Sequence, residues 1–458
     1  MQDWAVESHG EGTEMMDKKV TLATSLRSIE YPLLGTLILI SLLPTLYTTF
    51  RIFLLGALPN DWGFSIASQL AWVNIIYEVV QEALILPLFY LISRAMDNLS
   101  NLSNRLRTGL ITAFLIYFAI SLIVIVFAVP LLTFMKQKPE LIDATTSYIR
   151  LEAIAILISV LYRFLAIALT IMKRSRKLLQ LLSAQMVLTI VSDTFLVSAL
   201  PFSLALGVQG IAYGNIIVNL VLTGYAVYLV QCEGLQIVGR HGNDFSWQKE
   251  WFRIGGISGI ESFVRNAAFT LMIIRMINMV QQQGVFWVAN NFIWGWLLLP
   301  ILALGELIKR NTAVDRRSIT TQLPAYLFLT CAVCVLWVAS IPLWRPFIRT
   351  VMNVPDYLAV VDIVLLLLVY YMIFALNNIV DSIFYGLGRT DLMLYQSLIV
   401  NIFFYGGMFV AYRSGLFVPT LRAIALMFGI GMAIDSVITF TMFYLLRRRN
   451  REEYALLT

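Results

Sequence analysis

Twelve apolar stretches, each long enough to cross a bilayer as a helix, limit what this chain can fold into. A transmembrane helix needs about 20 predominantly apolar residues. The chain is 59% hydrophobic and 13% charged with a mean hydropathy of +0.79, more apolar surface than a soluble protein of this size could bury. We therefore predict an all-α polytopic membrane protein. The predicted spans are roughly 31–57, 66–94, 108–134, 148–172, 178–202, 205–231, 251–280, 285–308, 323–348, 357–386, 391–414 and 420–446.

Lysine and arginine collect on one side of this predicted topology, by about three to one over the other side, which places both termini in the cytoplasm. The net charge of +6 thus indicates membrane topology and not nucleic-acid binding. We expect a monomeric protein of the plasma (inner) membrane, whose partners are the lipid bilayer and a small-molecule substrate. The predicted division is a cytoplasmic leader (1–30), an N-lobe of spans 1–6 (31–232), a cytoplasmic linker (233–250), a C-lobe of spans 7–12 (251–446) and a cytoplasmic tail (447–458).

The sequence lacks the residues that a histidine metal site, nucleotide binding or nucleophilic catalysis would need. The only histidines are His9 and His241, which argues against a histidine metal site or a catalytic relay. Cys331 and Cys334 are spaced as CxxC inside an apolar span without a partnering ligand, which favours a packing role. The sequence contains no phosphate-binding loop and no nucleophile elbow. We expect neither an enzyme nor a cofactor.

The two halves of the chain repeat each other weakly. The segment 51–74 aligns with 275–296, so that Arg51 matches Arg275 and Trp72 matches Trp294. Six spans in each half, at an offset near half the chain, predict parallel repeats related by an axis along the membrane normal. Transporters of this kind bind substrate between their repeats.

At these residues the sequence resembles multidrug and toxic compound extrusion (MATE) transporters of the MOP flippase superfamily. The segments SAQMVLTIVSDTF (183–195), GVQGIAYGNIIVN (207–219), ISGIESFVRN (257–266) and WVANNFIWGWLLLPILALG (287–305) are similar to the family's fifth to eighth spans. The resemblance implies two pseudo-symmetric six-helix lobes arranged as an inverted V. It also implies alternating-access antiport, in which proton or sodium entry drives the export of amphipathic, often cationic, organic compounds.

The resemblance also points to residues that bind the coupling ion. Asp193 occupies the position of the family's fifth-span Asp, with Thr189 one turn earlier, and these oxygens suggest a possible Na⁺ near Asp193. Glu261 corresponds to an acidic residue of the seventh span. Arg51 stands where the family's first span carries an Asp, so Arg51 could instead pair with Asp193. No other metal site is predicted.

Span two carries Asn74, Glu78 and Glu82 on one helical face. Two carboxylates one turn apart repel when both are ionised, so one would hold a proton or a cation would lie nearby. The alternative is a structural ion pair with Arg51 or Arg163.

Polar residues in the C-lobe are candidates for lining a substrate cavity. We expect Arg265 to pair with Glu261, one turn away, and Arg275 to find a partner in Asp381 or Asp435. Asp381 is also a cation-coupling candidate. The predicted substrate-cavity residues are Arg51, Asn74, Arg163, Arg265, Arg275, Asn290, Asn291, Trp294, Asn378 and Asp435.

An alternative function uses the intramembrane arginines differently. Arg51, Arg265 and Arg275 in a central cavity could bind the phosphate groups of a lipid-linked or other anionic substrate, because arginine offers a bidentate fork. The protein would then be a flippase within the same superfamily.

Overall fold

A computed structural model describes residues 21–58, 62–93, 95, 98–172, 174–235 and 243–449, and in these ranges the chain is helical without a strand. Eleven helices are long and apolar enough to cross a membrane. A twelfth span forms if the pair Gln283–Leu297 and Leu299–Val314, bent by 54°, is counted as one. The predicted fold class is therefore confirmed.

The N-terminal half contributes the spans of the first bundle. Its helices are α1 (Leu22–Arg27), α2 (Tyr31–Gly56), α3 (Trp62–Ser68), α4 (Leu70–Leu84), α5 (Leu86–Ser93), α6 (Leu99–Val126), α7 (Ala128–Phe134), η1 (Pro139–Leu141), α8 (Ile142–Ile171), α9 (Ser175–Leu196) and α10 (Val208–Gln231). Proline residues account for several boundaries, because proline fits the first helical turn but removes a hydrogen bond further on. Pro139, for example, begins η1.

The C-terminal half contains more interrupted spans. Its elements are α11 (Gln248–Ala268), η2 (Phe269–Ile274), α12 (Arg275–Met279), α13 (Gln283–Phe292), η3 (Ile293–Leu297), α14 (Leu299–Val314), α15 (Ser318–Thr321), α16 (Leu323–Pro346), η4 (Phe347–Val351), α17 (Tyr357–Gly386), α18 (Thr390–Ile399), η5 (Val400–Tyr405), α19 (Gly406–Arg413) and α20 (Leu421–Arg449). The segments η2, η3, η4 and η5 are π-helical turns. Such turns often occur at functional sites.

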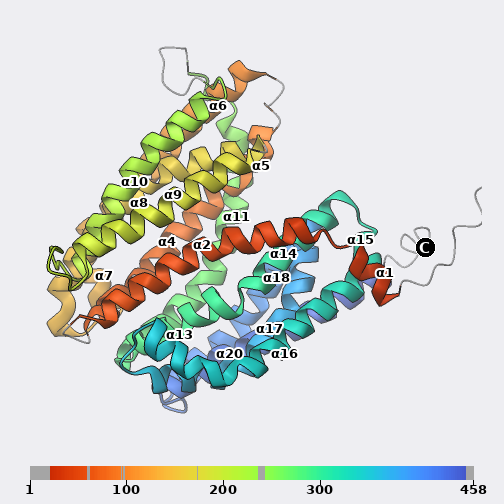
Figure 1. Cartoon of the computed structure of the whole chain (residues 1–458). Helices are drawn as coiled ribbons and strands as arrows, with labels where there is room; N and C mark the ends of the chain where they lie inside the picture. Colours follow the sequence, from red (N-terminus) through yellow and green to blue (C-terminus); the bar gives the residue numbers. More distant parts are fainter. Residues whose placement is uncertain are drawn as a thin grey trace, which may run out of the picture.

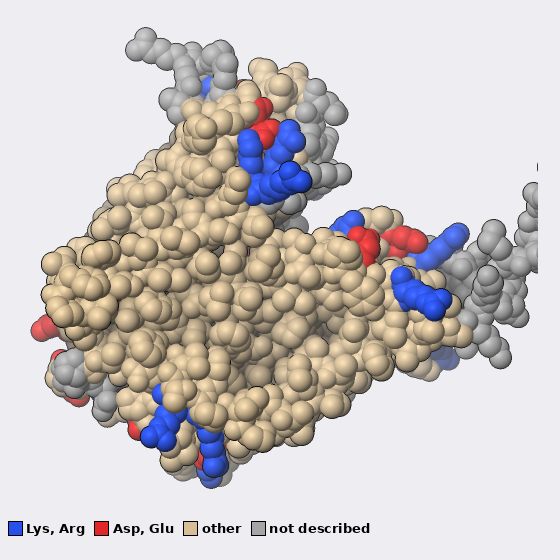
Figure 2. Space-filling view, in the orientation of Figure 1, with Lys and Arg blue, Asp and Glu red and all other residues tan. Residues whose placement is uncertain are grey.

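The helices form two bundles that diverge like the arms of a V (Figure 1). The arms meet near α7 and α13 and separate towards α6 on one arm and towards α1 and α15 on the other. Figure 2 shows the surface hollowed into a cleft between the separated ends, with lysine and arginine on both sides of it. The cleft therefore opens on the side where α1 lies.

Spans one and seven each contact both bundles. Helix α2 packs against α9 of the first bundle and α14 of the second. Glu30, the residue before α2, forms a 2.8 Å ion pair with Arg310 and so links the N-terminal end of α2 to the second bundle. Conversely, α11 packs against α4 and α5 of the first bundle, and the Trp251 indole donates a 2.7 Å hydrogen bond to the Leu84 carbonyl.

Two adjacent glycines in α11 allow a matched test of the contact with α4. A Cβ at Gly255 would lie 2.0 Å from the Ala83 carbonyl oxygen, whereas a Cβ at Gly256 would meet nothing within 4 Å. We expect Gly255→Ala to destabilise the protein by about 1–3 kcal/mol through overpacking. Gly256→Ala should be neutral or stabilising by up to about 1 kcal/mol, because alanine favours the helix. Thermal unfolding of the two variants in detergent measures the difference, and equal Tm values would contradict the close approach.

Candidate functional site

The main site is a cavity of about 570 Å³, here called the C-lobe cavity, bounded by α4 on one side and by α11, α13, α17, α18 and α20 on the others. Its apolar wall includes Trp294, Phe374 and Phe428. It brings together eight predicted site residues from five spans. These are Glu78, Glu82, Arg265, Asn290, Trp294, Asn378, Asp381 and Asp435.

Two of the carboxylates that line the cavity, Asp381 and Asp435, share one amide. The Asn377 side chain donates to Asp381 Oδ2 at 2.9 Å and, more weakly, to Asp435 Oδ2 at 3.4 Å. Gln396 donates to the same oxygen of Asp435 at 2.6 Å. Both amides are buried, with Asn377 0% and Gln396 4% exposed. Asp381 and Asp435 are thus held close together by neutral donors, and neither forms an ion pair with a described lysine or arginine.

Several oxygens around these carboxylates have no donor. Asp381 Oδ1, Asn377 Oδ1, Gln396 Oε1 and Ser382 Oγ are buried and lack a hydrogen-bond partner among the described residues. A buried polar atom without a partner costs free energy. Carboxylate, amide and hydroxyl oxygens are also the hard ligands that a small cation prefers. The cluster is therefore suited to a proton or a cation.

The rim of the cavity carries compensated charges. Arg265 forms a 2.6 Å ion pair with Glu82, from the other bundle, and Asn266 hydrogen-bonds to Glu78. Lys309 pairs with Glu306 at 2.7 Å. The excess negative charge of the cavity therefore belongs to Asp381, Asp435 and Glu78.

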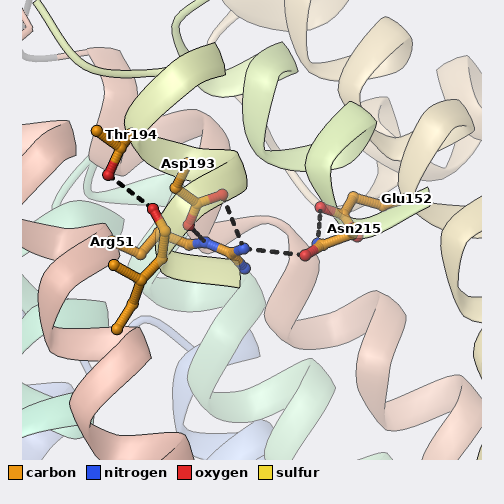
Figure 3. Close-up of polar contacts among 6 residues, drawn as sticks. Arg51, Glu152, Asp193, Thr194 and Asn215 are labelled. Carbon is orange, nitrogen blue, oxygen red and sulfur yellow. Dashed lines mark hydrogen bonds and ion pairs between the residues drawn. The ribbon is translucent and has the colours of Figure 1, made fainter. Parts of the chain in front are cut away.

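A second polar site lies inside the first bundle (Figure 3). Arg51 donates from Nε to Asp193 Oδ2 at 2.8 Å and from Nη2 to Asp193 Oδ1 at 3.2 Å. The same Nη2 reaches Asn215 Oδ1 at 2.9 Å, and Asn215 donates to both oxygens of Glu152 at 2.8 and 3.1 Å. Asp193 is 0% and Glu152 2% exposed. We call Arg51, Glu152, Asp193 and Asn215 the N-lobe charge network.

The network confirms the pairing of Arg51 with Asp193 that the sequence offered as an alternative to a cation site. Both carboxylate oxygens of Asp193 are engaged by the guanidinium. Thr189 is buried one turn away. The prediction did not include Glu152 and Asn215. Glu152 was detectable in principle as a lone carboxylate in an apolar span, and Asn215 lies in the GVQGIAYGNIIVN segment.

The remaining candidates lie elsewhere. The expected pairing of Arg275 with Asp381 or Asp435 is wrong: its Nε donates to the Phe134 carbonyl at 2.8 Å, and its guanidinium lies over the Phe134 ring. That contact exists because span seven ends against the first bundle. Asn291 lines a smaller cavity of about 230 Å³ beside α2.

Two further candidates are exposed, and one cannot be placed. Asn74 is exposed and is not among the residues lining the C-lobe cavity. Arg163 is exposed on α8, with Tyr47, Tyr117 and Tyr162 as its electrostatic neighbours. The side chain of Glu261 lies outside the described residues, so its predicted pairing and ion-binding role stay predictions.

Comparison with known proteins gives a consistent picture. Residues 95–195 match the family model MatE, whereas no curated protein matches the sequence. Among similar solved structures is an inward-facing multidrug resistance MATE transporter of the MOP superfamily, with a TM-score of 0.73, 17% identity and coverage of 88% of this chain and 94% of that one. An outward-facing MATE transporter gives a TM-score of 0.65 at 17% identity, covering 95% and 100%.

A third structure is a MOP superfamily transporter from Pyrococcus furiosus, described by a reverse polarity of its binding pocket that suggests a different function. Its TM-score is 0.67 at 16% identity, with 95% of this chain and 99% of that chain covered. The chain is thus an integral membrane protein whose residues 95–195 match the MatE family model and whose fold is that of solved MATE transporters, as its sequence motifs predicted.

Proposed function

We propose that the protein is a secondary transporter that exports amphipathic organic cations by alternating access, driven by the entry of H⁺ or Na⁺. The observation that carries this proposal is the C-lobe cavity. Its volume of about 570 Å³ lies within the range of roughly 300–1,000 Å³ that suits small organic ligands. Aromatic walls and uncompensated carboxylates favour a flat or bulky cation.

The same carboxylates supply a means of coupling. An ion that binds Asp381 and Asp435 in one conformation better than in the other shifts the balance between the two conformations. Because a cationic substrate would need these negative charges too, ion and substrate would compete for them. We place the coupling ion here and not near Asp193, since Arg51 already occupies both oxygens of Asp193.

The flippase alternative has less support. Arg51 is neutralised by Asp193 and Arg265 by Glu82, and Arg275 contacts the end of α7. These three arginines therefore do not present a shared anion site. We place the protein in the plasma membrane as a monomer, with both termini and the open cleft facing the cytoplasm.

Dye transport tests the proposal. Purified protein would be reconstituted into liposomes, and accumulation of ethidium would be followed by fluorescence under an imposed pH or Na⁺ gradient. We expect concentrative transport that stops when an ionophore collapses one of the two gradients, while liposomes without protein show none. Transport that is indifferent to both gradients would overturn ion coupling, and no transport of any organic cation would overturn the substrate class.

A further inference from the structure

A set of buried polar side chains joins the two bundles at the end of the molecule where the cleft is closed. Gln69, between α3 and α4, and Asn278 of α12 form a reciprocal amide pair, with both N–H···O distances 3.0 Å. Each residue is only 1% exposed. A reciprocal pair satisfies one donor and one acceptor on each side, so it fixes the two bundles in one register.

Further hydrogen bonds link the two bundles beside this amide pair. Asn278 also donates to the Met135 carbonyl at 2.8 Å. Gln283, the first residue of α13, donates to Ser65 Oγ at 2.6 Å and to Gln137 Oε1 at 3.2 Å. We call Ser65, Gln69, Gln137, Asn278 and Gln283 the seam cluster.

The seam cluster lies where the two bundles are in contact, at the end of the molecule opposite the open cleft. Its members come from α3 and the α7–η1 connection of the first bundle and from α12 and α13 of the second. In Figure 1, α7 and α13 lie where the arms of the V meet, far from the open cleft. Backbones approach closely around it: a Cβ at Gly284 would lie 3.1 Å from Phe64 Cβ, and one at Gly56 would lie 1.8 Å from the Asn353 carbonyl oxygen.

The chemistry of the cluster suits a contact that must break and re-form. Amide groups that bond to each other when buried can bond to water when exposed, so each hydrogen bond has only a modest net effect on the equilibrium. An apolar plug of the same area would resist opening more strongly, in proportion to the surface exposed to water. Gln283 Oε1, moreover, is buried without a partner among the described residues, which already weakens the closed form.

We propose that the seam cluster is the gate that closes the transporter on the side opposite the cleft, and that its amide pair Gln69–Asn278 opens when the bundles rock apart. The inference rests on the alternating access proposed above. Asn278 is the central member because it alone bonds to both Gln69 and the chain after α7.

Distance measurement between the bundles tests the gate. Spin labels would be attached at Glu140→Cys and Asp356→Cys, two exposed positions near the closed end on different bundles, in full-length protein whose three native cysteines are replaced by serine. We expect one short distance population in the parent protein. Asn278→Ala should increase the ratio of long to short distances by about tenfold or more, because its loss removes the acceptor of the Gln69 side-chain nitrogen and the donor to the Met135 carbonyl.

The control and a second variant keep the test decisive. Asn219→Ala removes a buried amide that also donates to a carbonyl, that of Ala155 at 2.8 Å, but within the first bundle, and it should leave the distances unchanged. Gln283→Ala should shift them in the same direction as Asn278→Ala, and Gln69→Ala added to Asn278→Ala should have little further effect. If Asn278→Ala and Gln283→Ala, each folded and monodisperse, keep the parent distribution, the gate is refuted. The distances between the labels are measured without substrate. Failure of dye transport would therefore count against the proposed function and not against the gate.

Discussion

Replacing Asp381 with Asn is expected to reduce ion-driven dye accumulation by about 100-fold, equivalent to about 2.8 kcal/mol at about 1.4 kcal/mol per tenfold. Asn keeps the shape of the side chain but removes the negative charge that an entering cation or proton would neutralise. The initial rate of ethidium accumulation in liposomes under a gradient measures the effect.

A surface residue of the same type provides the control for this prediction. Asp391 is paired with Arg389 at 2.8 Å, and both side chains are more than 40% exposed. Asp391→Asn should lower transport by less than about twofold, because exposed ion pairs contribute little. Exchange of dye between equal concentrations on both sides needs no net ion movement and should survive in Asp381→Asn. An Asp381→Asn protein that accumulates dye like the parent would remove Asp381 from the coupling mechanism.

Replacing Arg51 with Ala is expected to destabilise the folded protein by about 3–5 kcal/mol, the usual cost of breaking a buried ion pair from one side. Asp193 would then be left fully buried without its cation. The double variant Arg51→Ala/Asp193→Asn should recover much of the loss, because no buried charge remains unpaired. Thermal unfolding in detergent measures both, with Arg422→Ala as the control, since Arg422 and its partner Asp362 are exposed. A Tm for Arg51→Ala equal to that of Arg422→Ala would contradict the structural role of the pair.

The same variant tests whether the guanidinium replaces a mobile ion. If it does, removing Arg51 should create a site for a free cation beside Asp193 and Glu152. The Tm of Arg51→Ala should then rise more with added Na⁺ than the Tm of the parent protein does, and choline should raise neither. An equal rise of Tm with Na⁺ in Arg51→Ala and in the parent protein would show that no cation site forms when the arginine is removed.

Features that depend on one helix at a time could be predicted from the sequence. Apolar length gave the spans, and helical spacing placed Glu78 and Glu82 on one face, both lining the C-lobe cavity. Asp381 and Asp435 were recognisable because a carboxylate within a span is costly unless it has a function or a partner.

Contacts between helices could not be predicted in the same way. Arg265 reaches Glu82 across the bundles, 183 residues away in sequence, and Arg275 reaches the end of α7. Which helix faces which residue depends on packing and on the rotation of each helix, and single-span periodicity contains neither. Glu152 was overlooked for a related reason, since its importance comes from Asn215 and Arg51 on other spans.

The contacts that spans one and seven make with both bundles also affect how the protein is made. The first bundle contains the start of α11, whose Trp251 is 0% exposed and bonded to the Leu84 carbonyl. A ribosome that has produced only the first six spans has therefore not yet supplied every helix of that bundle. The first bundle can complete its packing only after residues 248–251 have been synthesised. We therefore expect both bundles to reach their final packing together, late in biogenesis.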